Sequence, residues 1–300
     1  MSEPMIYEVR HNTRLHYAGP VQLARFILRL QPAPWPGQRL LDYQLDITPP
    51  PRAIEHRQGP FLANRARLSL GQPISELTIE SRFRIEIAPA RPVLALAQGP
   101  SLAEITQAAL ASRDLSATGP ASYLYPSAIA TAEEEIGEWA APHLAPHRPV
   151  VAAARALMGA IHAAFRYDGT ATHAATPPIE AFRQRVGVCQ DFAHVMIIAA
   201  RAHGLPAAYI SGYLRTRPPE GQPRLLGADA MHAWVGIWCG DALGWVGFDP
   251  TNDMLVQTDH IFTAMGRDFA DVSPLDGVFH GGAGQTMLVG VDVIPQDELA

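Results

Sequence analysis

Cysteine is scarce in this sequence, since the 300 residues contain two. Two thiols cannot form the disulfide framework of a small secreted domain, and a free thiol suits a reducing compartment better. The chain also lacks a run of about 18 apolar residues and a basic N-terminal segment that leads into an apolar stretch. We therefore expect neither a membrane span nor a standard secretion signal, and we predict a cytoplasmic protein.

An excess of positive charge is also missing. Lys and Arg number 23 against 29 Asp and Glu, which gives a formal net charge of −6. A chain without a basic excess is poorly suited to neutralise a phosphate backbone or an anionic bilayer. We therefore predict that neither nucleic acid nor a membrane is a partner.

Compact metal-binding motifs are absent as well. The 12 histidines are scattered, and the sequence contains no HExxH pair, no CxxC pair and no EF-hand loop. We predict that the protein requires no metal ion and no other cofactor.

The hydrophobic pattern divides the chain into three parts. A composition of 48% hydrophobic and 17% charged residues is typical of a folded protein, and 300 residues are enough for two domains. Residues 1–90 contain short alternating segments with Gly or Pro breaks, which predicts an all-β, sandwich-like domain. Residues 91–149, rich in Pro, Ala and acidic residues, are interpreted as a connecting region with one helix. Residues 150–300 mix helical and strand patterns, so the predicted class is α+β.

A last alternating segment, TMLVGVDVIP at residues 286–295, predicts one more strand. We group it with the core formed by residues 150–300. Alternation indicates which face of a strand is buried but does not identify the partner strand, so the sequence does not decide which sheet this segment joins.

Cys189 lies in the first turn of a predicted helix. After it, apolar residues recur with helical spacing until Gly204 and Pro206 end the helix. Free N–H groups and a partial positive charge at a helix N-terminus favour a thiolate and can hold an oxyanion. The N–H of Gln190 either lines that oxyanion site or belongs to an ordinary polar residue of the first turn. Without partners, Cys189 itself would be interpreted as a small buried residue.

Those partners are predicted in a β-hairpin, where HAWVGIWC and GWVGFDP flank the four-residue turn GDAL. We pair Cys239 with Gly244. This register places Asp249 opposite Trp234 and makes His232 a diagonal neighbour of Asp249 on the same face. The carboxylate can then orient the imidazole of a histidine base. An odd loop length would separate the two side chains, and Cys239 is expected to pack on the opposite face.

Three segments, GVCQDFAHVMI, MHAWVGIW and GWVGFDPTN, together resemble the bacterial transglutaminase-like superfamily of cysteine enzymes. The resemblance implies a papain-like α+β core whose nucleophilic helix packs on an antiparallel sheet. It also implies that Cys189 is the nucleophile, His232 the base and Asp249 its orienting group. The opening MIYEVRHNTRLHYAGPV is similar to the family's N-terminal β region, and GRDFADVSPLDGVFHGGAG is similar to the segment that follows the aspartate.

Two aromatic residues are further candidates for this site. Trp234 flanks the predicted triad and either walls a cleft or fills the core. Tyr167 falls where the family often has an aromatic residue after the first helix, and its hydroxyl reaches either the cleft or a backbone partner.

The resemblance implies a peptide or protein amide as substrate and a thioester intermediate. With water as the second substrate the protein is a cysteine peptidase or amidase, which we expect first. With an amine it is a cross-linking transglutaminase, and a peptide-binding module without chemistry is the alternative from another class. The sequence leaves the natural substrate open and allows a homo-oligomer.

Overall fold

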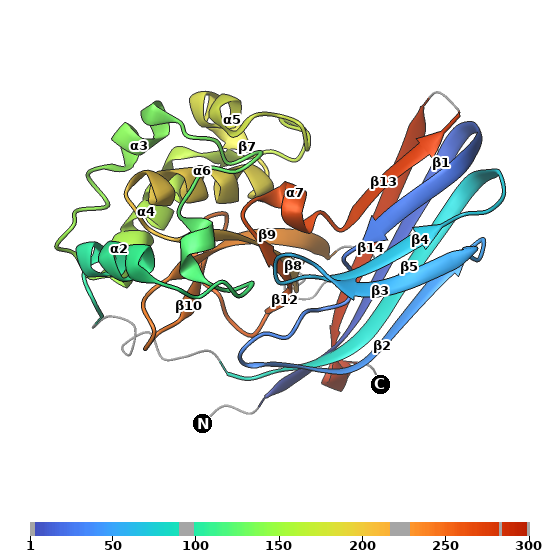
Figure 1. Ribbon diagram of the computed structural model, residues 1–300, viewed down its shortest axis with the longest axis horizontal. Coiled ribbons are helices and arrows are strands. Elements are labelled where there is room, and N and C mark those ends of the chain that lie inside the picture. The colour runs from blue at the N-terminus through green and yellow to red at the C-terminus, as the bar shows by residue number, and fades with distance from the viewer. Residues whose placement is uncertain (1–3, 90–98, 217–228, 282–283, 299–300) are drawn as a thin grey trace.

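Two units lie side by side in the computed structural model, which describes residues 4–89, 99–216, 229–281 and 284–298 (Figure 1). One unit consists of strands, and the other consists of helices around a second sheet. The predicted α+β class with an all-β N-terminal domain is therefore confirmed.

The long strand β1 (Met5–Leu28) organises the β domain because it takes part in both halves of a seven-stranded sheet. Its register shifts between His16 and Val21, where the strand passes from one half to the other. On one side, its first part pairs with β5 (Ile74–Ile87) and its last part with β4 (Asn64–Ser69). The outer strands are β2 (Gln38–Thr48), which pairs with β5, and β3 (Ala53–Gln58), which pairs with β4.

Apolar side chains from the two halves of this sheet meet in one core. Leu15 and Leu77 come from the first half, Phe26 and Leu68 from the second, and all four are at most 4% exposed. Alternation along each strand sends every second side chain toward this core. The two halves therefore pack face to face, in the sandwich-like arrangement predicted for residues 1–90.

The C-terminal strands correct the predicted domain boundaries. β13 (Leu275–His280) and β14 (Gln285–Pro295) both pair with β1 in the β domain and not with the sheet of the second unit. β14 follows β1 over eleven paired residues, from Tyr7 opposite Pro295 to Tyr17 opposite Gln285. The assignment of this strand to the 150–300 core was wrong. β5 pairs with one edge of the first part of β1, and β14 pairs with the other edge.

The second unit is built on an antiparallel sheet of five strands in the order β11-β10-β9-β8-β12. Its strands are β8 (Ala207–Leu214), β9 (Ala230–Trp238), β10 (Trp245–Asp249), β11 (Met254–Leu255) and β12 (His260–Gly266). Two short strands, β6 (Arg166–Tyr167) and β7 (Val186–Gly187), pair in parallel as a separate sheet. The short helices that follow are α7 (Phe269–Val272) and η2 (Gln296–Glu298).

Helix α6 (Cys189–Ala202) packs against β9 and is the central helix of this unit (Figure 1). It also contacts α3 (Glu134–Ala140), α4 (Val150–Ala164) and α5 (Pro178–Gln184). Because helices and sheet surround it, its side chains from Asp191 to Arg201 are all buried. Among the described residues, no helix combines the length and the apolar character needed to cross a bilayer.

The predicted connecting region is part of this core, which is a second correction. It contributes α2 (Leu102–Ala111), η1 (Pro120–Tyr123) and α3, while residues 90–98 lie outside the described residues. Ile105 and Ile136 are at most 1% exposed and share one apolar cluster with α4 and α6. The alanine content that suggested a linker instead serves close packing, since Ala109 and Ala140 are fully buried.

A separate apolar cluster joins the two units. It contains Tyr7 and Val9 from β1, Val293 from β14, and Tyr213 and Ile261 from the second sheet, all fully buried. Since the cluster draws on both ends of the chain and on β8 and β12, the β domain and the second unit share buried surface.

We expect Val293→Ala to lower the free energy of unfolding by about 2 kcal/mol, because it removes two buried carbons and leaves a cavity at the junction. Denaturant unfolding followed by circular dichroism and by tryptophan fluorescence should show one shared transition. Val278→Ala is the matched control, since Val278 on β13 is 69% exposed and its loss should change stability by less than about 0.5 kcal/mol. Two separate transitions would contradict a shared core.

Candidate active site

Strands β9 and β10 form the predicted hairpin in the predicted register. Trp245 pairs with Trp238, and the N–H of Cys239 donates to the carbonyl of Gly244 at 2.8 Å. Gly240 and Gly244 have φ angles of 91° and 67°, which glycine adopts without strain. The four-residue turn therefore sets a register that brings the end of β10 beside the start of β9.

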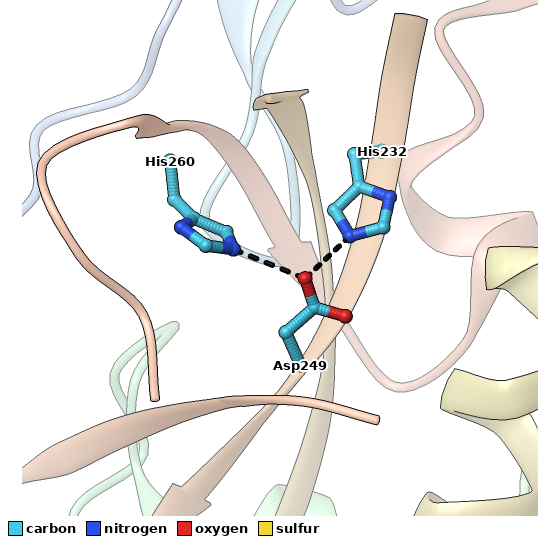
Figure 2. Close-up of side chains that lie close together, drawn as sticks. All are labelled: His232, Asp249 and His260. Carbon is cyan, nitrogen blue, oxygen red and sulfur yellow. Dashed lines mark hydrogen bonds and ion pairs between the residues drawn. The ribbon is translucent and has the colours of Figure 1, made fainter. Parts of the chain in front are cut away.

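In this register, the imidazole of His232 meets the carboxylate of Asp249. The His232 Nε2–H donates to Asp249 Oδ2 at 2.8 Å (Figure 2). Asp249 is fully buried and His232 is 9% exposed. Because Nε2 is bound to the carboxylate, Nδ1 is the ring nitrogen left to exchange a proton with another group.

Asp249 is held by donors on both of its oxygens. Oδ2 also accepts from Asn252 Nδ2 at 2.7 Å and from His260 Nε2 at 3.1 Å. Oδ1 accepts from the backbone N–H groups of Thr251 at 3.0 Å and Asn252 at 3.2 Å. Burial alone would raise the pKa of this carboxyl, but the hydrogen bonds from its two histidine neighbours and Asn252 hold that pKa far below its usual range. Asp249 is therefore a buried, fully partnered anion.

His232 is tuned by the same pair of opposing effects. Burial would lower the pKa of its imidazole, but hydrogen bonds with Asp249 and Cys189, together with the negative charge of these groups, raise it from 6.5 to about 10. The side chain is therefore an imidazolium at neutral pH, in contact with both a carboxylate and a thiol.

Cys189 is the first residue of α6, as predicted, and is a free, partly buried thiol. The backbone before it is fixed by Asp191, whose Oδ2 accepts from the Val188 N–H at 2.8 Å and from Thr172 Oγ1 at 2.6 Å. A Cβ at Gly187 would lie 2.5 Å from this oxygen, so only glycine allows the approach. The helix start is thus locked: the N–H groups of Asp191 and Phe192 donate to the Val188 carbonyl, and those of Cys189 and Gln190 precede the first of these helical hydrogen bonds.

The three other predicted residues have different positions. Tyr167 is 57% exposed and pairs with Gly187, and burial together with the negative charge of Cys189 raises the pKa of its hydroxyl. The Gln190 side chain donates to the Ala174 carbonyl at 3.4 Å. Trp234 is 2% exposed and lies in the core, not in a cleft wall.

Comparison with known proteins identifies the family. Residues 7–86 match the bacterial transglutaminase-like N-terminal region, and residues 138–250 match the transglutaminase-like superfamily. The chain belongs to the transglutaminase-like superfamily. An uncharacterized protein of Mycobacterium tuberculosis (strain ATCC 25618 / H37Rv) is 36% identical over 294 residues, which cover 96% of this chain and 92% of the relative. One from Mycobacterium leprae (strain TN) is 28% identical and covers 95% of this chain and 97% of the relative.

Two further similarities are a shared fold and a short local match. A crystal structure of a candidate cysteine protease from Cytophaga hutchinsonii superposes with a TM-score of 0.75 at 20% identity, covering 99% of this chain and 92% of that one. This similarity shows a shared fold. A protein-glutamine gamma-glutamyltransferase of Pseudomonas aeruginosa is 37% identical over 71 residues, which are 23% of this chain and 10% of that protein.

Two residues that contact Asp249 are not among those predicted from the sequence. Asn252 follows three residues after it in the segment DPTN, a spacing at which an aspartate often accepts hydrogen bonds from the turn that follows. That local signal was available. His260 lies at the start of the distant edge strand β12, and no local pattern connects it with Asp249.

His232, Asp249 and His260 also lie close enough together to be considered as a metal site, since their ligand atoms are within 4.8 Å of one another. The hydrogen bonds favour a different interpretation. The N–H of Gln257 donates to His260 Nδ1 at 3.3 Å, so a neutral His260 carries its proton on Nε2 and has no lone pair there for a metal. The residues present therefore fit a hydrogen-bonded cluster better than a metal-ion site.

We expect Asp249→Asn to lower the pH at which His232 loses its proton by about three pH units, because burial then acts without the carboxylate. In the wild type, the raised pKa of His232 contributes stability that is complete below pH 6.5 and is lost as the pH rises toward 10. This loss should be nearly absent in the variant. NMR titration of the histidine ring and thermal unfolding at several pH values measure both effects.

The matched control is Asp268→Asn. Like Asp249, Asp268 is buried, with 1% of its surface exposed. Its carboxylate accepts from the Ile129 N–H at 2.8 Å and, among the described residues, has no hydrogen bond with His232. This variant should leave the His232 titration unchanged. An unchanged His232 titration in Asp249→Asn would contradict the assigned electrostatics of the pair.

Proposed function

We propose that this protein is a transglutaminase-like cysteine peptidase or amidase that acts on a carboxamide of a peptide or protein through a thioester on Cys189. The observation that carries the proposal is the buried His232–Asp249 hydrogen bond in contact with a thiol at the first residue of a helix. Membership of the superfamily and the shared fold of the candidate cysteine protease support it.

The first step is attack of the Cys189 thiolate on the substrate carbonyl carbon. The new C–S bond moves the carbonyl electron pair onto oxygen, where free N–H groups of the first turn of α6, including that of Gln190, stabilise the oxyanion. As the carbonyl re-forms, the C–N bond breaks. The His232 imidazolium gives its proton to the departing nitrogen, which leaves as ammonia or an amine.

The second step returns the enzyme to its starting state. Neutral His232 takes a proton from water, and the resulting hydroxide attacks the thioester carbonyl. The C–S bond then breaks, the acid product leaves, and Cys189 is again a thiolate beside an imidazolium. Asp249 stays ionised throughout, orients the ring and stabilises its positive charge.

A second candidate is amine transfer, in which a primary amine replaces water in the second step. The local similarity to a protein-glutamine gamma-glutamyltransferase favours it. Both reactions share the thioester, so the same residues serve either one. Because the proposal needs Cys189 as a free thiol, we also propose a reducing compartment, the cytoplasm.

Cys239 is a poor nucleophile by comparison. It is fully buried, and burial raises the pKa of its thiol to about 12. Its side chain lies in the apolar cluster between the sheet and α6. The chain therefore contains its own internal control for thiol reactivity.

We expect iodoacetamide to label Cys189 rapidly at about pH 6.5, where an ordinary thiol with a pKa of about 8.5 is almost entirely protonated. Labelling measured by mass spectrometry should slow at least about tenfold in His232→Ala and stay unchanged in Cys239→Ala. Slow labelling of Cys189 that begins only near pH 8.5 would contradict the enzyme and leave a peptide-binding module.

Ammonia release from glutamine-containing peptides, with and without an added primary amine, then separates the two reactions. Hydrolysis yields glutamate without the amine, whereas transfer yields a mass increase equal to the amine minus ammonia. Cys189→Ala should abolish both products while retaining the wild-type unfolding temperature within a few degrees.

A further inference from the structure

Two histidines share a single carboxylate oxygen in this site. His260 Nε2 lies 3.1 Å from Asp249 Oδ2, the same atom that binds His232 Nε2 at 2.8 Å, and both rings point toward it (Figure 2). The His260 side chain is 1% exposed and is the first residue of β12. No step of the proposed reaction uses it.

The proton of His260 is assigned by its surroundings. The backbone N–H of Gln257 donates to Nδ1, so Nδ1 presents a lone pair and Nε2 carries the proton that Asp249 accepts. The N–H of His260 returns a hydrogen bond to the Gln257 carbonyl at 3.1 Å. Trp234 packs edge-on against the ring at 5.3 Å and 82°. The ring is therefore held with its donor aimed at Asp249.

Asp249 Oδ2 has more hydrogen-bond donors than lone pairs. His232, His260 and the Asn252 amide all donate to it, whereas a carboxylate oxygen has two lone pairs. The donors therefore compete, and each weakens the hold of the oxygen on the others. The adjacent Asp259 accepts from the Tyr7 hydroxyl at 2.8 Å and lies 3.7 Å from the guanidinium of Arg215.

We infer that His260 is a positioning residue that acts through Asp249, limiting how tightly that carboxylate holds the His232 proton. The inference rests on the proposed function for its purpose, because His232 must first keep its proton beside the thiolate and then give it to the leaving nitrogen. A carboxylate that accepts a hydrogen bond from a second donor binds the imidazolium less tightly than a carboxylate that binds the imidazolium alone. His260 thus sets the balance between an activated thiolate and an acid able to release its proton.

The test is a ring titration of His232 by NMR in the full chain carrying Cys189→Ala. This background removes Cys189, which otherwise raises the His232 pKa, so that the titration reports the effect of Asp249 and its other partners. His260→Phe keeps an aromatic ring without a donor and should raise the titration midpoint of His232 by about one pH unit. His260→Gln restores an amide donor and should return the midpoint toward that of the parent.

His11→Phe is the matched control. His11 is also buried, with Nδ1 at 3.0 Å from the Tyr213 hydroxyl and Nε2 at 2.8 Å from Thr13 Oγ1, and these partners do not include Asp249. This variant should lower the unfolding temperature and leave the His232 midpoint in place. A midpoint in His260→Phe that is unchanged or lower would overturn the inference, as would a failure of His260→Gln to reverse the shift.

The same titration separates this inference from the proposed function. It needs no thiol and no substrate, so it decides the role of His260 by itself. Slow iodoacetamide labelling of the wild type would contradict the enzyme alone. A raised midpoint in His260→Phe together with fast wild-type labelling supports both.

Discussion

A buried negative charge at Asp249 is the constraint on which the site depends. A carboxylate removed from water is strongly unfavourable unless donors surround it, and here they come from β9, β12 and the turn after β10. In the sheet, β9 and β8 lie between β10 and β12, so His260 contacts Asp249 from a strand that does not neighbour β10. The site is thus stable only when the whole second sheet is assembled.

Helix α6 supplies the other part of the site, the thiol of Cys189. Its first turn carries the thiol, and Asp191 fixes that turn by binding the backbone of Val188 and the side chain of Thr172. The remainder of the helix is buried among α3, α4, α5 and the sheet, so the thiol cannot shift without disturbing the core. Rigid elements therefore hold both halves of the site, as a preorganised reaction centre requires.

The β domain contributes to this arrangement through packing. Strands β1 and β14, from the two ends of the chain, pair with each other. The apolar cluster around Tyr7 and Val293 packs them against β8 and β12. His260 starts β12, so the strand that carries it is held on one side by β8 and on the other by the β domain. This contact connects a domain without catalytic side chains to the partners of Asp249.

The sequence by itself determined the local features of this protein. Helical spacing placed Cys189 at the start of α6, and alternation with the GDAL turn set the register that joins His232 to Asp249. These features depend on neighbours along the chain, which periodicity and turn residues report directly. The family resemblance extended the prediction to the β domain.

Only the tertiary structure decided which distant segments meet. It placed β13 and β14 beside β1, packed the helices after residue 99 into the core, and brought His260 to Asp249. Alternation shows that a strand has a buried face, but it carries no information on the partner strand. The hydrogen bond between His260 and Asp249, eleven residues apart in the sequence, depends on tertiary structure and could not be predicted from a local pattern.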